Sequence, residues 1–214
     1  MRPRPVVAIL AGGESRRMGR DKATIELDGV SVIERIARAA ASAGLRCIVV
    51  GRARPHIRAS TPSHEASTRD VREPDELIED WIEDDSPGEG PLAALATALR
   101  RVGGDVILVA CDMPLVDPAS FEWLSSLVVD DSVAGVVPRN DRTLEPLFAR
   151  YGPEALPAIE EVLLTGRRSI GALIDRGGIA IVDLPEKLRE RLANVNTPED
   201  LIRVRRVLEA RSKD

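Results

Sequence analysis

The chain has 214 residues, of which 43% are hydrophobic and 30% are charged, and its formal net charge at pH 7 is −5. This length suits one well-packed core and is short for two, so we expect one domain spanning residues 1–214. The absence of an apolar run of about 18 residues argues against a membrane span, and the acidic balance argues against a general nucleic-acid surface. Because the apolar run after the basic N-terminus is short, we expect no signal peptide and a cytoplasmic location.

The first predicted strand is the apolar run 5–10, which leads into residues 10–22 with the sequence LAGGESRRMGRDK. A glycine pair lets the backbone turn tightly and present bare N–H groups to a ligand. Arg16, Arg17, Arg20 and Lys22 place positive charge around that turn. The combination predicts a site for a polyanion such as a nucleoside triphosphate, and the competing interpretation is an exposed basic turn. A P-loop is excluded because no hydroxyl residue follows Lys22.

The next segments alternate helix and strand, which is typical of an α/β layered domain. Ser31 and Glu34 form a capping-box pattern that opens a helix ending near Gly44, and residues 45–50 read as a buried strand. Residues 73–89 carry nine acidic side chains and no basic one. Apolar residues recur there at helical spacing, so we expect an amphipathic helix with a solvated acidic face, built on Leu77, Ile78, Trp81 and Ile82.

The second half continues the alternation. Pro91 suits the first turn of a helix that starts at Gly90, and Asp117-Pro118 caps another. We expect strands at 105–110, 133–137, 144–148 and 178–183, and helices at 153–165 and 169–176. A final helix is capped by Thr197 and begins with Pro198. These elements predict a mostly parallel sheet covered by helices on both faces.

Asp112 directly follows the buried strand 105–110. In open parallel sheets ligands bind at the carboxyl ends of the strands, so Asp112 is expected to share an edge with the 10–22 loop. A carboxylate beside a triphosphate suits Mg²⁺, which takes one or two carboxylates together with phosphate oxygens and water. The alternative is a turn or capping aspartate. The same edge is where we expect a metal, with Asp112 as its protein ligand.

Residues 194–197 read Asn-Val-Asn-Thr and precede the last helix. In an extended segment, alternation points the amides of Asn194 and Asn196 the same way. Amides both donate and accept hydrogen bonds, so the pair can bind an acceptor substrate or, through Asn196, a metal. A turn role for the asparagines competes with this interpretation.

Taken together, these motifs resemble those of the molybdenum cofactor guanylyltransferases, which attach GMP from GTP to molybdopterin and release pyrophosphate. The likeness includes the 10–22 loop, Glu83-Asp84 before Gly90-Pro91-Leu92, Cys111-Asp112-Met113-Pro114, Glu145-Pro146-Leu147-Phe148 with Tyr151, Gly166-Arg167-Arg168-Ser169, and residues 194–201. It covers most of the chain in the family's order. The implied fold is a three-layer Rossmann-like nucleotidyltransferase domain with a mostly parallel central sheet.

The resemblance also implies roles for particular residues. It places GTP on Leu10, Ala11, Gly12, Gly13, Lys22, Asp84 and Asp112, with Glu83 and Asp85 as alternatives to Asp84. It places molybdopterin on Arg17, Gly90, Arg167, Arg168, Asn194 and Asn196. The resemblance assigns catalysis to Arg17, Lys22 and Asp112, and it implies that Asp112 binds Mg²⁺. Some members carry an asparagine where this chain has Gly51, so that contact is not carried over.

Two related activities stay open as alternatives, cobinamide-phosphate guanylyl transfer and cytidylyl transfer to the molybdenum cofactor. Residues 10–13, Leu-Ala-Gly-Gly, resemble the sequence of the enzymes that use GTP. Related cytidylyltransferases usually carry Leu-Ala-Ala-Gly there, so Gly12 favours GTP. A third alternative is a catalytically silent pterin-binding partner of molybdoenzymes. The resemblance further implies molybdoenzymes or cofactor-biosynthesis proteins as possible partners, and neither nucleic acid nor membrane.

Overall fold

The structure is a computed structural model that describes residues 3–12, 26–51, 74–86, 88–128, 130 and 132–211. Its strands are β1 (Val6–Leu10), β2 (Glu26–Leu27), β3 (Val30–Ser31), β4 (Cys47–Val50), β5 (Asp80–Ile82), β6 (Val106–Ala110), β7 (Gly135–Asn140), β8 (Thr143–Leu144), β9 (Phe148–Tyr151) and β10 (Ile179–Asp183). Its α-helices are α1 (Val32–Ser42), α2 (Pro74–Leu77), α3 (Gly90–Val102), α4 (Pro118–Ser126), α5 (Leu156–Leu164), α6 (Ile170–Arg176) and α7 (Pro198–Arg211). Two 3-10 helices, η2 (Pro153–Ala155) and η3 (Glu186–Leu192), complete the described elements.

One mixed sheet organises these elements in the order β10-β7-β9-β6-β1-β4-β5, with β8 paired to the end of β7. The pairs β1–β4, β1–β6, β4–β5 and β7–β10 are parallel, whereas β9 runs antiparallel to both β6 and β7. Strands β5, β4, β1, β6, β7 and β10 therefore point the same way, and their carboxyl ends share one edge. The prediction of a mostly parallel central sheet is confirmed.

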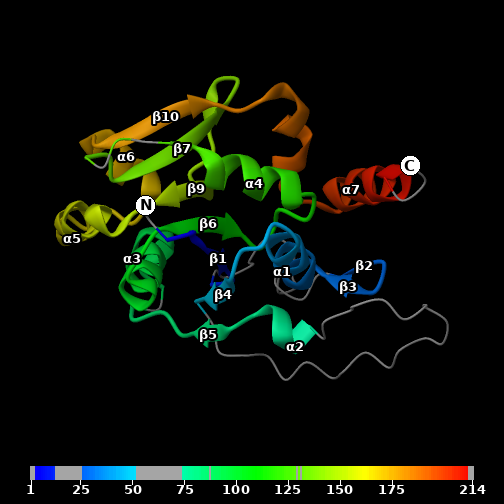
Figure 1. The fold of residues 1–214 in the computed structure, drawn as a ribbon, viewed down its shortest axis with the longest axis horizontal. Helices are drawn as coiled ribbons and strands as arrows, with labels where there is room; N and C mark the ends of the chain where they lie inside the picture. Colours follow the sequence, from blue (N-terminus) through cyan, green and yellow to red (C-terminus); the bar gives the residue numbers. More distant parts are fainter. Residues whose placement is uncertain are drawn as a thin grey trace.

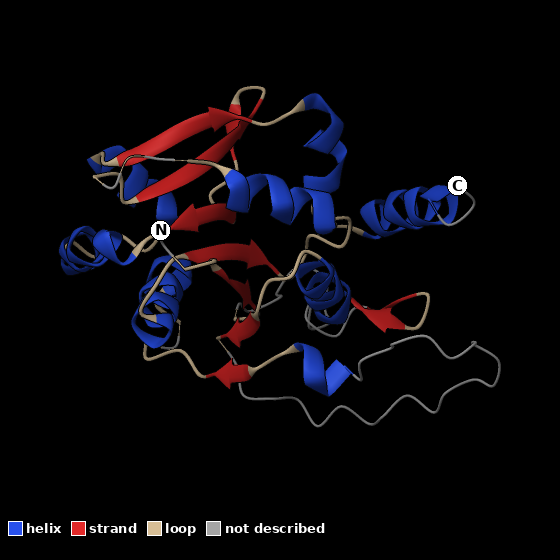
Figure 2. Cartoon of the chain, in the orientation of Figure 1, coloured by secondary structure: helices blue, strands red, loops and turns tan. Residues whose placement is uncertain are grey.

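Helices cover both faces of this sheet, which makes three layers (Figures 1 and 2). All five residues of β1 are buried, and alternate side chains enter different cores. Val7 and Ile9 pack with residues of α1 and α4, whereas Ala8 and Leu10 pack with residues of α3, α5 and α6. Burial on both faces explains why the strand reads as a continuous apolar run.

Helix capping follows the sequence closely. The hydroxyl oxygen of Ser31 accepts from the Glu34 amide at 3.2 Å, and Asp117 Oδ1 accepts from the Ser120 amide at 3.0 Å. These bonds satisfy amides that the first turn of a helix leaves without partners. Helix α3 begins at Gly90 with Pro91 in its first turn, as predicted.

Two predicted elements are wrong in part. The predicted amphipathic helix ends at Leu77, and residues 80–82 form strand β5, which pairs with β4 through Ile48–Asp80 and Val50–Ile82. The predicted strand 144–148 is interrupted, because β8 ends at Leu144 and β9 begins only at Phe148. The backbone between these two strands crosses the edge of the sheet. In the described part of the chain, no helix is long and apolar enough to cross a membrane.

Candidate active site

The backbone joins the ends of β1 and β6 at the carboxyl edge of the sheet. The amide of Cys111 donates to the carbonyl oxygen of Leu10 at 3.2 Å, and the amide of Ala11 donates to that of Val50 at 2.9 Å. Asp112, which follows Cys111, therefore leaves the sheet beside the segment Leu10–Gly12. Asp112 therefore shares this edge with Leu10–Gly12, the described start of the predicted 10–22 loop, and the predicted ligand roles of these residues remain proposals.

Gly12 and Gly51 meet backbone to backbone at this edge. A Cβ atom placed on Gly51 would lie 2.6 Å from the Gly12 nitrogen, and one on Gly12 would lie 3.1 Å from the Gly51 Cα. Gly51 also has φ = +107°, a backbone conformation that residues with a side chain rarely adopt. Sequence reasoning set Gly51 aside and did not predict this contact, because Gly12 follows β1 whereas Gly51 follows β4. The pair fixes where the backbone leaves β1, before the glycine-rich loop.

The Asn194–Asn196 segment lies against Asp112. The amide of Val195 donates to the carbonyl oxygen of Asp112 at 2.8 Å, and the Val195 side chain is fully buried. Asn194 is half-buried, and its Oδ1 is buried without a hydrogen-bond donor among the described residues. Asn196 is exposed. The two amide side chains therefore flank an anchored backbone, and one of them offers an unused buried acceptor.

The start of α7 holds this segment in place. Asp200 Oδ2 accepts from the backbone amides of Asn196 and Thr197, both at 3.0 Å, and Thr197 Oγ1 accepts from the Asp200 amide at 3.2 Å. The hydrogen bond from the Asn196 amide, followed by those from Thr197, lowers the pKa of Asp200. Thr197 and Asp200 thus cap the helix together, and the turn orients the asparagines that precede it.

The three acidic candidates after β5 have different surroundings. Asp84 is half-buried, and its Oδ1 accepts from the Ser86 amide at 3.2 Å and the Thr97 hydroxyl at 3.3 Å. Asp85 is exposed and its carboxylate lies 3.8 Å from the guanidinium of Arg100, and Glu83 is also exposed. Asp84 thus combines partial burial with a side-chain hydrogen bond to α3. The structure thus distinguishes Asp84 from its two neighbours, while its contact with the nucleotide stays a prediction.

Gly90 and Arg168 form a second group. The carbonyl oxygen of Arg168 accepts from the Leu92 amide at 3.2 Å, and a Cβ on Gly90 would lie 3.0 Å from that oxygen. The Arg168 guanidinium pairs with Glu89 at 3.0 Å and donates to the Leu163 carbonyl at 2.9 Å. Arg168 therefore links the start of α3 to the end of α5, and Gly90 allows its backbone to come close.

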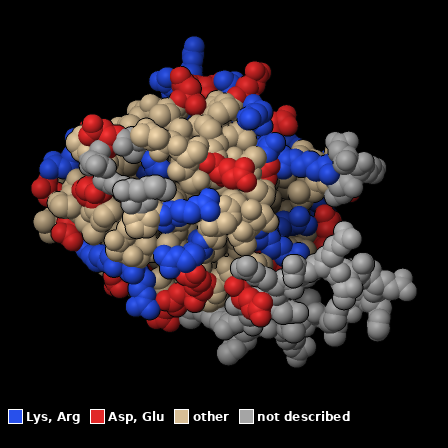
Figure 3. Space-filling model, in the orientation of Figure 1, with Lys and Arg blue, Asp and Glu red and all other residues tan. Residues whose placement is uncertain are grey.

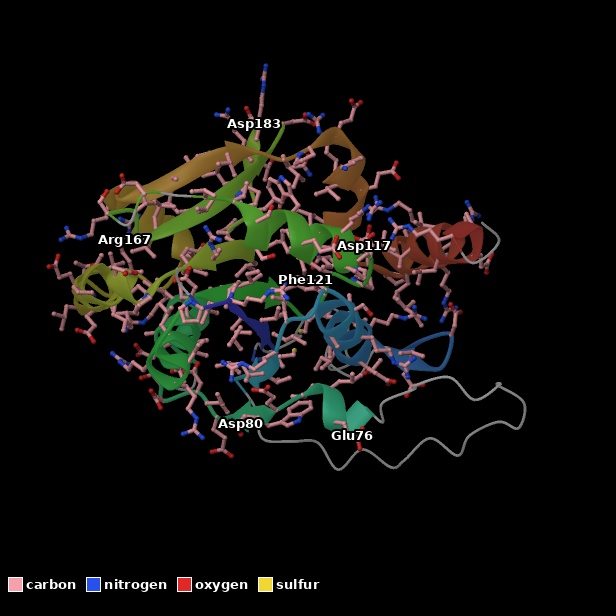
Figure 4. All side chains as sticks on the ribbon, viewed as in Figure 1. Glu76, Asp80, Asp117, Phe121, Arg167 and Asp183 are labelled. Atoms are coloured by element: carbon pink, nitrogen blue, oxygen red, sulfur yellow. The ribbon has the colours of Figure 1, made fainter. Side chains whose placement is uncertain are left out.

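Arg167 points elsewhere than Arg168. It pairs with Asp175 at 2.6 Å and lines a groove of about 400 Å³ between α5 and α6. Figure 4 shows Arg167 at the end of the molecule formed by α5 and α6. Asp117, five residues after Asp112, lies on the opposite side of the molecule, near α7. The two arginines, which the sequence alone did not distinguish, therefore have different partners: Arg167 pairs with Asp175, and Arg168 pairs with Glu89.

Gly13, Arg17 and Lys22 lie outside the described residues, so their predicted roles stay predictions. Among the residues that are described, no group of three or more His, Cys, Asp or Glu side chains could hold a metal ion. On the face shown in Figure 3, acidic and basic side chains are interspersed over the described surface.

The fold and this edge together define a class of protein. A mostly parallel sheet places a backbone turn, one carboxylate and two amides at the carboxyl ends of adjacent strands, where α/β proteins bind nucleotides. These groups suit the positioning of phosphates. They define a nucleotidyltransferase-type site.

Comparison with known proteins gives the family. The model of the MobA-like NTP transferase domain matches residues 7–180. The chain is 36% identical to a probable molybdenum cofactor guanylyltransferase of Opitutus terrae, covering 93% of this chain and 94% of that protein. It is 33% identical to one of Synechococcus elongatus, covering 90% and 93%. The crystal structure of molybdopterin-guanine dinucleotide biosynthesis protein A from Archaeoglobus fulgidus superposes with a TM-score of 0.73 at 28% identity, covering 95% and 98%. The chain belongs to the MobA-like NTP transferase family.

Proposed function

We propose that this protein transfers GMP from GTP to the terminal phosphate of molybdopterin, forming molybdopterin guanine dinucleotide and pyrophosphate. One observation carries the proposal. The bonds Cys111 N to Leu10 O and Val195 N to Asp112 O bring three segments, distant in sequence, to one edge. These are the segments that the family resemblance assigns to GTP, to the metal and to molybdopterin.

The reaction is an in-line displacement. A phosphate oxygen of molybdopterin attacks the α-phosphorus of GTP, the bond from that phosphorus to the bridging oxygen breaks, and the electron pair leaves with pyrophosphate. No protein nucleophile is required, so the protein must align two polyanions and stabilise the charge that develops between them. The backbone amides of Gly12 and Gly13 and the side chains of Arg17 and Lys22 are proposed to bind the phosphates of GTP, while the Ala11 amide is already bonded to Val50.

The oxygen atoms of Asp112 and Asn194 are suitable ligands for Mg²⁺. Asp112 supplies a carboxylate, and the buried Oδ1 of Asn194 accepts no hydrogen bond from the described residues. Such a sparse oxygen set suits a cation that completes its coordination with phosphate and water. Asp112 would hold the ion, with an amide oxygen of Asn194 or Asn196 beside it. When bound, Mg²⁺ supplies a Lewis acid for the triphosphate oxygens.

Acceptor binding is assigned first to the Asn194–Asn196 segment, which Val195 bonds to Asp112. Asn194 and Asn196 are proposed to bind molybdopterin, together with Arg17, Gly90 and the Arg167-Arg168 pair. Arg168 is favoured within that pair because it packs against Gly90. Transfer of the product to a molybdoenzyme, a contact with another cofactor-biosynthesis protein and a cytoplasmic location remain predictions.

The test is product formation with different nucleotides and acceptors. Purified protein is incubated with Mg²⁺, with GTP, CTP or ATP, and with molybdopterin or cobinamide phosphate, and the dinucleotide is identified by mass spectrometry. The proposal expects product with GTP and molybdopterin only. Product with CTP, or with cobinamide phosphate, would replace it with one of the related activities. Binding of GTP without any product would indicate a silent binding partner.

A further inference from the structure

Glu145 lies beside the carboxyl edge of the sheet, on the β7 side of β6 and away from β1. It follows β8, and its amide donates to the carbonyl oxygen of Pro138 in β7 at 2.9 Å. Two residues later, the carbonyl oxygen of Leu147 accepts from the Ala110 amide at the end of β6 at 3.0 Å. The segment Glu145–Leu147 therefore links Pro138 within β7 to the end of β6, two residues before Asp112.

The Glu145 side chain is half-buried there, and the described residues supply it with an incomplete set of partners. Its carboxylate interacts with the side chain of Asn140, and burial raises its pKa. Among the described residues, no lysine, arginine or histidine lies within 4.0 Å of it as an ion-pair partner. A desolvated carboxylate without a cation is unfavourable unless hydrogen-bond donors reach it. The stabilising donors can come from a ligand.

We propose that Glu145 accepts paired hydrogen bonds from the 2-amino group and the adjacent ring N–H of the acceptor's pterin. This inference rests on the proposed function, since it names the subsite for the acceptor's ring. An ionised carboxylate has two acceptor oxygens and no donor, so it matches a ligand edge with two parallel N–H donors. Guanine presents a similar edge, but Glu145 lies beyond β6, on the side away from the Leu10–Gly12 segment and Asp84.

The hydrogen-bond pattern gives a direct test with two small probes. 6-Hydroxymethylpterin carries the 2-amino donor, whereas 6-hydroxymethyllumazine has a carbonyl acceptor in its place. Binding of each probe to the full chain is measured by equilibrium dialysis at pH 7 with GTP and Mg²⁺ present. The wild type should bind the pterin at least about tenfold more tightly, because the lumazine carbonyl faces a carboxylate.

Glu145→Gln should invert this preference. The glutamine amide offers one acceptor and one donor, which match the ring N–H and the carbonyl of lumazine. Pterin affinity should fall about 10- to 100-fold, the range for hydrogen bonds to a charged group. Glu145→Asp keeps both acceptor oxygens and should retain the pterin preference with weaker binding. Glu160→Gln, which removes an exposed carboxylate on α5 paired with Arg100, is the matched control and should behave as the wild type.

Equal binding of the two probes by the wild type, no pterin binding, or an unchanged preference in Glu145→Gln would overturn the inference. Turnover of GTP with molybdopterin is measured separately. Turnover without a Glu145-dependent preference removes the pterin subsite and leaves the proposed function. A Glu145-dependent preference without turnover supports the subsite and rejects the proposed function.

Discussion

The backbone amide of Val195 lies 2.8 Å from the carbonyl oxygen of Asp112 and donates a hydrogen bond to it. This bond holds the asparagine segment before α7 against the end of β6. Val195 itself is fully buried in the core that lies between the sheet and α1. The position of Asn194 and Asn196 therefore depends on the packing of the residue between them.

Val195→Ala should weaken both stability and catalysis. Removing two buried carbons costs about 2 kcal/mol and loosens the segment that carries the asparagines. Val204→Ala is the matched control, because Val204 is equally buried in the same core and lies in α7. Urea unfolding should give similar losses for the two variants. Only Val195→Ala should raise the KM for molybdopterin, and an equal KM in both variants would separate Val195 from the site.

Gly51→Ala should disrupt nucleotide binding. The new methyl group would lie 2.6 Å from the Gly12 nitrogen, so the backbone after β1 must shift. Calorimetry should show GTP affinity lower by at least about tenfold, or about 1.4 kcal/mol. Gly177→Ala controls for backbone strain, since Gly177 has φ = +96° and an added Cβ would meet no atom within 4 Å. It should lose about 1–2 kcal/mol of stability while keeping GTP affinity. Equal GTP affinity in the two variants would contradict the account.

Arg168→Ala and Arg167→Ala should differ. The Arg168 side chain pairs with Glu89 and donates to the carbonyl oxygen of Leu163. Its loss should displace the start of α3 and raise the KM for molybdopterin by about tenfold or more. Arg167 forms an exposed pair with Asp175, worth about 1 kcal/mol or less, so its loss should change kinetics little. Steady-state kinetics measure both, and a larger effect from Arg167 would reverse the assignment.

Glu145→Gln should stabilise the protein relative to the wild type, and more so as pH rises. Because burial raises the pKa of Glu145, its ionised form is less favourable in the folded state than in the unfolded chain. The wild type therefore loses stability between the ordinary pKa of a glutamate and the raised value, while glutamine does not titrate. Thermal unfolding from pH 4 to pH 7 should show the Tm difference growing with pH. A difference that is constant with pH would argue against a desolvated carboxylate.

The sequence predicted those parts of the fold that local chemistry determines. The buried strands β1 and β6 are continuous apolar runs, and the caps at Ser31 and Asp117 satisfy amides within three residues. The helical interpretation of Trp81 and Ile82 is wrong because their spacing fits a helix, whereas pairing with β4 makes them a strand. That pairing depends on a distant segment, which local periodicity does not reveal.

The sequence allowed single residues of the candidate site to be named, and their roles stay predictions, but it did not show how the residues are arranged. Asp112 could be placed at the carboxyl edge because it follows an apolar strand. The contact of Gly51 with Gly12 and the bond from Val195 to Asp112 join segments far apart in the chain, so the sequence carries no local signal for them. Glu145 stands within a motif of the family resemblance, but its surroundings emerge only from the packing of β7, β8 and β9.

The most direct measurement compares pyrophosphate release by the wild type and Asp112→Asn, with Mg²⁺, GTP and molybdopterin, alongside GTP binding by calorimetry. We predict release by the wild type that requires molybdopterin and is abolished by chelation of the metal. In Asp112→Asn, kcat should fall by about 100-fold or more while GTP affinity changes less than about tenfold, because Asp112 acts mainly on the transition state. A variant that releases pyrophosphate at the rate of the wild type would contradict the assignment of Asp112, and with it the proposed site.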